Sequence, residues 1–161
     1  MTSKKIVYID MDGVLVDLVG AVYEKYVHSL GDDEFEVGKV IDQDVEPFYK
    51  AAPMPGAIEA FKQLSSDPRF EPYILSTAPW ANVESLTAKR VWVEKFIGHT
   101  ATKRLILTHR KDLMFGDYLI DDRPNNGAAE FKGEWIKFGS EQYPDWASVL
   151  LKLEQDADKN T

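Results

Sequence analysis

The stretch KKIVYIDMDGVLVD, residues 4–17, decides the fold of this 161-residue chain. Its first part, Lys4–Ile9, fills with β-branched and aromatic residues, which is typical of a strand buried on both faces. Asp10 and Asp12 follow at the carboxyl end of that strand, and Gly13 lets the backbone turn sharply after them. Because side chains alternate along an extended chain, both carboxylates can point to the same side. The stretch therefore predicts a buried strand that carries two carboxylates at its end.

The rest of the chain alternates between strand and helix patterns after the turn signal APMPG at residues 52–56. Strands that alternate with helices predict a mostly parallel α/β sheet. The strand patterns cover residues 72–76, 104–108, 117–121 and 134–138, and the helix patterns cover residues 57–65, 82–97 and 126–131 and a segment that starts at residue 145.

A helical insertion separates the first strand from the rest of the sheet. Apolar residues recur at helical spacing from Asp17 to Leu30, and Gly31 is the expected stop. The acidic residues 32–52 show no strand pattern, so we expect one or two short helices there. The chain is thus expected to divide into a core of residues 1–16 and 56–155, a helical insertion of residues 17–55 and a polar, flexible tail of residues 156–161.

The composition narrows the class of partner. A formal net charge of -8 argues against a polynucleotide ligand, because such binding needs clustered Lys and Arg side chains. The chain has no cysteine, which excludes disulfides, thiolate metal sites and a cysteine nucleophile. The sequence shows neither a signal-peptide core nor an apolar run near the ~20 residues of a membrane span. We therefore expect a soluble, cytoplasmic protein, monomeric or homodimeric, that binds a small ligand and neither polynucleotide nor membrane.

Four carboxylates fall at the ends of two expected strands. Asp10 and Asp12 follow the first strand, whereas Asp121 and Asp122 lie at the end of the strand at residues 117–121. Ligands of parallel α/β sheets bind outside the carboxyl ends of the strands, so we expect these side chains to meet. Converging carboxylates repel one another and lose hydration unless a hard cation neutralises them. Oxygen ligands of this kind favour Mg2+, which commonly binds one or two carboxylates, waters and a substrate phosphate.

Two further strand ends offer groups for a phosphate. Ser76 and Thr77 supply hydroxyls at one end, and His109, Arg110 and Lys111 supply cations and donors near the other. Taken singly, each motif also fits a plain structural role: the Asp-x-Asp-Gly segment a turn, the hydroxyls a helix cap and Lys111 a surface charge. Their coincidence at strand ends within one chain favours a combined metal and phosphate site.

These motifs resemble the signatures of the haloacid dehalogenase superfamily of aspartate-nucleophile phosphatases. The segment DMDGVLVD is similar to the first signature, and Ser76, Lys111 and the pair Asp121 and Asp122 are similar to the second, third and fourth. Within that superfamily, the segments PMPGA, STAP, WVEKFIG, LTHRK and YLIDDRP resemble those of the 5'(3')-deoxyribonucleotidases, or cytosolic type C 5'-nucleotidases. The likeness covers residues 4–126. It implies a Rossmann-like, three-layer α/β core with a central parallel sheet and a small helical cap inserted after the first strand.

The resemblance also implies a catalytic role for several residues. Asp10 would be the nucleophile that forms an aspartyl-phosphate, and Asp12 the general acid for the leaving group and then the base for water. Ser76 and Lys111 would hold the phosphoryl oxygens, with Thr77 as a further substrate contact. Covalent catalysis divides phosphomonoester hydrolysis, one of the slowest uncatalysed reactions, into two easier displacements.

A Mg2+ site is implied by the same resemblance. Asp10 would bind the ion through its carboxylate and Asp12 through its backbone carbonyl. Asp121 would contribute a second carboxylate, and Asp122 would act through water.

The cap is where this sequence departs from the family pattern. Phe48 and Tyr49 match an aromatic pair that sandwiches the base in deoxyribonucleotidases, yet they fit the apolar core of the cap equally well. Trp80, just after Ser76, is a third candidate for the pocket wall. Leu18 stands where the animal enzymes have Phe, and the cap is shorter. The ligand is therefore expected to be a nucleoside monophosphate or another small phosphoester, or a phosphate bound by a catalytically silent module.

Overall fold

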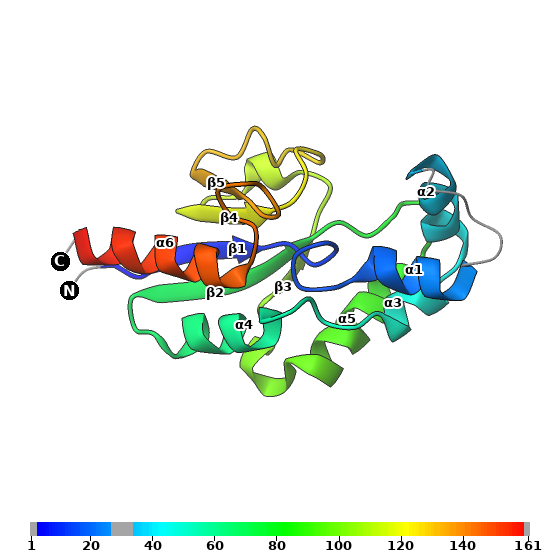
Figure 1. Cartoon of the computed structure of the whole chain (residues 1–161), viewed down its shortest axis with the longest axis horizontal. Helices are drawn as coiled ribbons and strands as arrows, with labels where there is room; N and C mark the ends of the chain where they lie inside the picture. The colour runs from blue at the N-terminus through cyan, green and yellow to red at the C-terminus, as the bar shows by residue number, and fades with distance from the viewer. Residues whose placement is uncertain (1–2, 27–33, 160–161) are drawn as a thin grey trace.

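The central feature of the fold is one parallel sheet. The computed structural model describes residues 3–26 and 34–159, and its five strands run in the order β3-β2-β1-β4-β5 (Figure 1). All neighbouring strands are parallel, which confirms the predicted α/β class. The strands are β1 (Lys5–Ile9), β2 (Phe70–Ser76), β3 (Leu105–Leu107), β4 (Tyr118–Asp121) and β5 (Glu134–Lys137).

The first strand lies in the middle of the sheet. β1 pairs with β2 on one side and with β4 on the other. From β1 to β3 the chain adds strands toward one edge of the sheet, and from β4 onward it adds them toward the other edge. In open α/β sheets the crevice for ligands lies at such a reversal, outside the carboxyl ends of the strands. The Asp10 amide donates to the Ile120 carbonyl at 2.9 Å, which keeps the ends of β1 and β4 together beyond the ladder itself. The topology therefore creates a crevice where the aspartates lie.

Helices cover one face of the sheet. The main apolar cluster joins Val7, Ile9 and Ile74 of the strands to residues of the flanking helices, including Phe61 and Trp146. The helices outside the cap are α4 (Ala57–Ser66), α5 (Glu84–Phe96) and α6 (Trp146–Lys159), with short 3-10 turns at Gly98–Ala101 and Lys111–Leu113.

Irregular chain covers the other face, where the predicted helix at residues 126–131 is wrong. Residues 125–130 form consecutive turns instead. The backbone of Asn126 has φ 55° and that of Gly127 has φ 81°, and two left-handed residues in succession stop a right-handed helix. Phe131 still fulfils the expected packing role, because it joins a second apolar cluster with Tyr8 of β1.

The last helix is longer than its composition suggests. The polar end of the chain is expected to fray from residue 156, but α6 continues to Lys159. Lys152 forms an ion pair with Asp156 one turn later at 2.6 Å, and Ala157 packs against the main cluster. Residues 160–161 lie outside the described residues.

The cap consists of helices beyond the carboxyl ends of the strands, at the end of the molecule opposite to the start of β1 and the end of α6 (Figure 1). The two linkers that join it to the core run side by side: the Asp17 amide donates to the Ala52 carbonyl, and the Met54 amide to the Leu15 carbonyl, both at 2.9 Å. The predicted stop of the first cap helix near Leu30 lies outside the described residues. The described cap helices are α1 (Leu18–Tyr26), α2 (Glu34–Gln43) and α3 (Glu46–Lys50).

Candidate active site

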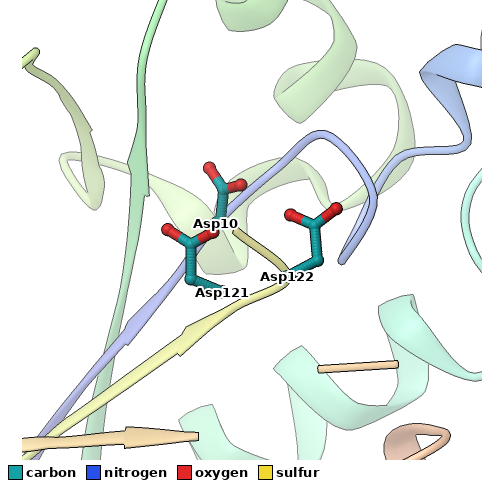
Figure 2. Close-up of side chains that lie close together, drawn as sticks. All are labelled: Asp10, Asp121 and Asp122. Atoms are coloured by element: carbon teal, nitrogen blue, oxygen red, sulfur yellow. The ribbon is translucent and has the colours of Figure 1, made fainter. Parts of the chain in front are cut away.

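Three of the four predicted aspartates converge at the crevice. Asp10 follows β1, Asp121 ends β4 and Asp122 comes next in the chain. Each offers a carboxylate oxygen, and these oxygens lie within 4.8 Å of one another. Figure 2 shows the three side chains extending from the two strand ends into a common space. Asp10 and Asp121 are buried, at 8% and 2% exposure.

The turn after β1 requires glycine at residue 13 for two reasons. Gly13 has φ +79°, a backbone conformation that L side chains rarely adopt. A Cβ atom there would also lie 2.3 Å from Oδ2 of Asp122. The Met11 carbonyl closes the turn by accepting the amides of Leu15 and Val16 at 2.8 and 2.9 Å. The backbone therefore passes directly against the third carboxylate.

A buried lysine lies among the carboxylates. Lys111 Nζ is 2.5 Å from Asp121 Oδ2 and 3.0 Å from Asp10 Oδ1. The Lys111 amide donates to the Asn126 carbonyl at 2.8 Å, which fixes the start of this short 3-10 turn. Trp135 Nε1 donates to the Asp121 carbonyl at 3.0 Å from the next strand. The lysine and its main carboxylate partner are thus both held by backbone contacts.

The electrostatics of the cluster favour a cation. Burial raises the pKa of Asp10 to about 7, opposed by Lys111 and assisted by the charges of Asp121 and Asp12. Burial also raises the pKa of Asp122 to about 6, and it raises the pKa of Asp121. Burial disfavours the charge of Lys111, but Asp10 and Asp121 outweigh that effect and raise its pKa. One lysine leaves these carboxylates short of positive charge, and their oxygen donors fit a hard divalent ion.

Asp12 directs its carboxylate elsewhere. Its Oδ2 accepts a hydrogen bond from Lys89 Nζ at 2.6 Å. Lys89 lies on α5 and is only 1% exposed. It was not among the site residues predicted from the sequence. The signal was available, because a lysine stands within the apolar stripe of that helix, whose other buried residues are Ser85, Ala88, Trp92 and Val93.

The hydroxyls after β2 have different surroundings. Ser76 is fully buried. Its Oγ forms no hydrogen bond with any of the described residues. Buried polar atoms are normally paired, so this hydroxyl is short of a partner. Thr77 lines the cleft described below, and its Oγ1 donates to the Thr108 carbonyl at 2.7 Å.

A cleft of about 400 Å³ opens above the carboxylates. The cap contributes the apolar side chains of Leu18, Val19 and Ile41 to the lining. Trp80 and His109 also line the cleft, and their rings meet edge-on with centroids 5.8 Å apart. Trp80 is 87% exposed. The lining comprises Asp10, Asp12, Gly13, Leu18, Val19, Ile41, Thr77, Pro79, Trp80, His109, Lys111, Asp121, Asp122, Arg123, Asn125 and Asn126.

Phe48 and Tyr49, the expected aromatic contacts for the base, lie in the cap. Neither ring lines the cleft. Phe48 is 2% exposed within the main apolar cluster, and Tyr49 packs against that cluster. The alternative interpretation, that both rings belong to the core of the cap, describes their position. Of the two rings on the short helix α3, that of Phe48 is buried and that of Tyr49 is partly buried.

The fold is that of the haloacid dehalogenase-like hydrolases. A haloacid dehalogenase-like hydrolase from Streptococcus pneumoniae is similar at TM-score 0.60 and 14% identity, over 94% of this chain and 91% of that chain. The protein YfnB of Bacillus subtilis, in a magnesium-bound form, is similar at TM-score 0.54 and 12% identity, over 89% of this chain and 90% of that chain. At such low identity these two structures establish the fold alone.

Sequence relatives narrow the class to a family. The family model described as "5' nucleotidase, deoxy (Pyrimidine), cytosolic type C protein" matches residues 39–145. A Vibrio phage KVP40 protein assigned by name to the 5'(3')-deoxyribonucleotidases is 49% identical over 152 residues, which cover 94% of this chain and 86% of the relative. Human mitochondrial 5'(3')-deoxyribonucleotidase is 28% identical over 152 residues, which cover 80% of this chain and 67% of the human protein. The chain therefore belongs to the 5'(3')-deoxyribonucleotidase family of phosphoric monoester hydrolases.

Proposed function

We propose that this chain is a Mg2+-dependent phosphomonoesterase that dephosphorylates deoxynucleoside monophosphates through an aspartyl-phosphate on Asp10. The observation that carries the proposal is the position of the Asp10 carboxylate. It lies at the floor of the cleft, with Asp121 and Asp122 within 4.8 Å and with Lys111 as an ion-pair partner. A nucleophile placed there is accessible from the cleft and has the Lys111 ammonium group beside it.

The residues at the crevice fit Mg2+. The carboxylates of Asp10 and Asp121 would hold the ion, with Asp122 acting through water. The Asp12 carboxylate is paired with Lys89 through Oδ2, and the backbone carbonyl of Asp12 is the proposed ligand for the ion. A bound Mg2+ would neutralise charge on the transferring phosphoryl group. The raised pKa values of Asp10 and Asp122 support the assignment, because a cation would keep both carboxylates ionised.

The chemistry consists of two displacements that both use Asp10 and Asp12. The Asp10 carboxylate attacks phosphorus and forms a new P–O bond, while the ester P–O bond breaks and Asp12 donates its proton to the leaving alkoxide. Water then attacks the aspartyl-phosphate and loses its proton to Asp12. Inorganic phosphate leaves, and Asp10 is again a free carboxylate.

Ser76 and Lys111 are the proposed phosphoryl ligands on the protein side. Lys111 supplies a buried positive charge beside the nucleophile. The Ser76 hydroxyl lacks a partner, and a phosphoryl oxygen would satisfy it. Thr77 lines the cleft, whereas Ser76 is fully buried and is not among the lining residues. Donors that are already in place cost little reorganisation when charge develops on the phosphoryl oxygens.

Trp80 is the proposed contact for the base. It is the exposed aromatic ring at the rim of the cleft, and His109 supports it edge-on. Leu18 and Ile41 form the apolar wall on the cap side, where a deoxyribose would pass between base and phosphate. A cleft of about 400 Å³ has the size of a small-ligand pocket.

The test is a phosphate-release assay with the purified chain and Mg2+. Deoxynucleoside 5'- and 3'-monophosphates are compared with ribonucleotides and sugar phosphates, and the Asp10→Asn variant is the negative control. We expect the deoxynucleotides to have the highest kcat/KM and the variant to be inactive. Equal rates whatever the base would favour a phosphatase of another small phosphoester. A folded wild-type chain that turns over none of these esters would favour a silent phosphate-binding module.

A further inference from the structure

We propose that Lys89 is a positioning residue that fixes the Asp12 carboxylate for proton transfer, an inference that rests on the proposed function. Lys89 Nζ donates to Asp12 Oδ2 at 2.6 Å from inside the protein. The Asp12 side chain is 31% exposed and borders the cleft, whereas that of Lys89 is 1% exposed. Lys89 thus contacts the Asp12 carboxylate from the protein interior, and Lys89 itself is not accessible from the cleft.

The ion pair with Asp12 offsets the cost of burying the Lys89 charge. The lysine lies on the face of α5 that packs into the core, between Ala88 and Trp92. A buried ammonium group is costly unless a carboxylate pairs with it. Asp12 is the carboxylate that forms an ion pair with Lys89 in the described part of the chain. A packing role alone would be met by an apolar side chain, so the charge points to Asp12.

One carboxylate oxygen of Asp12 remains for chemistry. Lys89 engages Oδ2. Oδ1 would then exchange the proton with the leaving group and later with the attacking water. A free aspartate can rotate about its side-chain bonds, and immobilising it in advance removes that entropic cost from the reaction. Proton transfer also requires the acid and the acceptor oxygen to be within hydrogen-bond reach, so a rotated carboxylate would be ineffective.

The cap contributes to this arrangement through Phe48. Lys89 Nζ lies 5.3 Å from the centre of the Phe48 ring, a cation–π contact. Trp92, one turn further along α5, donates from Nε1 to the Ala51 carbonyl at 2.8 Å and so fastens the end of α3. The buried ring that does not reach the cleft therefore confines the lysine that holds the acid.

The experiment compares two esters that differ in how much they need an acid. Thymidine 5'-monophosphate has a poor alkoxide leaving group, whereas p-nitrophenyl phosphate has a good leaving group that needs little protonation. For Lys89→Met we expect kcat/KM to fall about 100-fold with the nucleotide and less than about 5-fold with the aryl ester. Equal losses with both esters, or no loss with either, would overturn the inference.

Two further variants keep the result interpretable. Lys89→Arg retains the charge but presents a wider planar head group that turns the carboxylate, so we expect the same unequal loss with a smaller factor. This variant serves as the test if Lys89→Met fails to fold by circular dichroism, and equal losses in it would likewise overturn the inference. In the Asp12→Asn background, Lys89→Met should cause no further loss with the nucleotide; an additional full loss would show that Lys89 acts independently of Asp12.

Arg90→Met is the matched control. Arg90 neighbours Lys89 on α5, and it forms an exposed ion pair with Glu94 at 2.9 Å. We expect both esters to be hydrolysed at the wild-type rate by this variant. A loss in Arg90→Met equal to that in Lys89→Met would attribute the effect to the helix and would overturn the inference. A wild-type chain that hydrolyses neither ester removes the proposed function itself, which is a separate outcome.

Discussion

Lys111 and Asp121 form the closest buried ion pair around the crevice, with 2.5 Å between Nζ and Oδ2 and with both side chains almost fully inaccessible to solvent. Asp10 lies 3.0 Å from the same ammonium group. The pair thus joins the end of β4 to the 3-10 turn Lys111–Leu113, and it supplies the positive charge next to the nucleophile. Both stability and turnover should depend on it.

Replacing Lys111 with methionine should destabilise the metal-free protein. Removing one partner of a buried ion pair leaves uncompensated charge, which typically costs ~3 to 5 kcal/mol of unfolding free energy. We expect Mg2+ to restore part of this loss, because it neutralises the same carboxylates, and kcat to fall on the order of 100-fold or more. Urea unfolding with and without Mg2+ measures the first effect. Lys50→Met, which removes an exposed lysine paired with Glu46, should change stability by less than about 1 kcal/mol.

Mg2+ binding should weaken at acidic pH. The pKa of Asp10 is raised to about 7 and that of Asp122 to about 6, so between about pH 4 and those values the folded state binds more protons than the unfolded state. The contribution of these groups to the stability of the metal-free protein is therefore present at low pH and is lost as the pH rises to about 7. Since Mg2+ displaces those protons, its stabilising effect should be larger at about pH 8 than at about pH 5.

Thermal unfolding with and without Mg2+ at the two pH values checks this prediction. The Asp10→Asn variant serves as the control, because it lacks the most strongly shifted carboxyl group and should show a weaker pH dependence. A Mg2+-induced rise in Tm that is the same at both pH values in the wild-type chain would contradict the prediction.

Alanine at Gly13 should damage both the turn and the metal site. The substitution forces a left-handed backbone, which costs ~1 to 2 kcal/mol, and places a methyl group 2.3 Å from the present position of Asp122 Oδ2. Gly98→Ala is a matched control, because Gly98 has φ +73° but no neighbouring atom within 4 Å. We expect both variants to lose stability and only Gly13→Ala to lose Mg2+ affinity, as measured by calorimetric titration. Equal Mg2+ affinity in the two variants would argue against the role given to Asp122.

Removal of Trp80 should weaken nucleotide binding without affecting the fold. Stacking of a base on an aromatic ring is worth about 1 to 3 kcal/mol, so KM for a deoxynucleotide should rise roughly 5- to 100-fold in Trp80→Ala. The KM for p-nitrophenyl phosphate, which carries no nucleobase, should rise less. Phe115→Ala removes a ring of similar exposure, 84%, that does not line the cleft, and it should leave both values unchanged. A KM for the nucleotide that is unchanged in Trp80→Ala would exclude the proposed platform.

The sequence predicted the floor of the site well because strand geometry fixes it. An apolar run that ends in Asp10 and a second that ends in Asp121 both belong to parallel strands, so their carboxyl ends lie at the same edge of the sheet. Neighbouring strands lie only about 5 Å apart, which brings the end residues within reach of one cation. Here the local pattern determines the tertiary contact.

The walls of the site were harder to predict, because they depend on packing between distant segments. Phe48 lies in a helix of five residues, too short for periodicity to show which face is buried. Lys89 pairs with a carboxylate 77 positions away, and only the docking of α5 against the turn after β1 brings them together. The helix predicted at residues 126–131 does not form because Asn126 adopts a left-handed backbone. Asparagine tolerates that conformation, but its presence in a sequence does not predict it.

The adjacent linkers of the cap have an evolutionary consequence. Because the chain leaves the core at Leu15–Asp17 and re-enters it at Ala52–Met54 through two hydrogen-bonded segments, the inserted helices begin and end at one place. Lengthening, shortening or exchanging the intervening helices would leave the ends of β1 and β4 where they are. Descendants of such a gene can acquire new substrates by remodelling one contiguous segment, while the carboxylates at the ends of β1 and β4 stay in place.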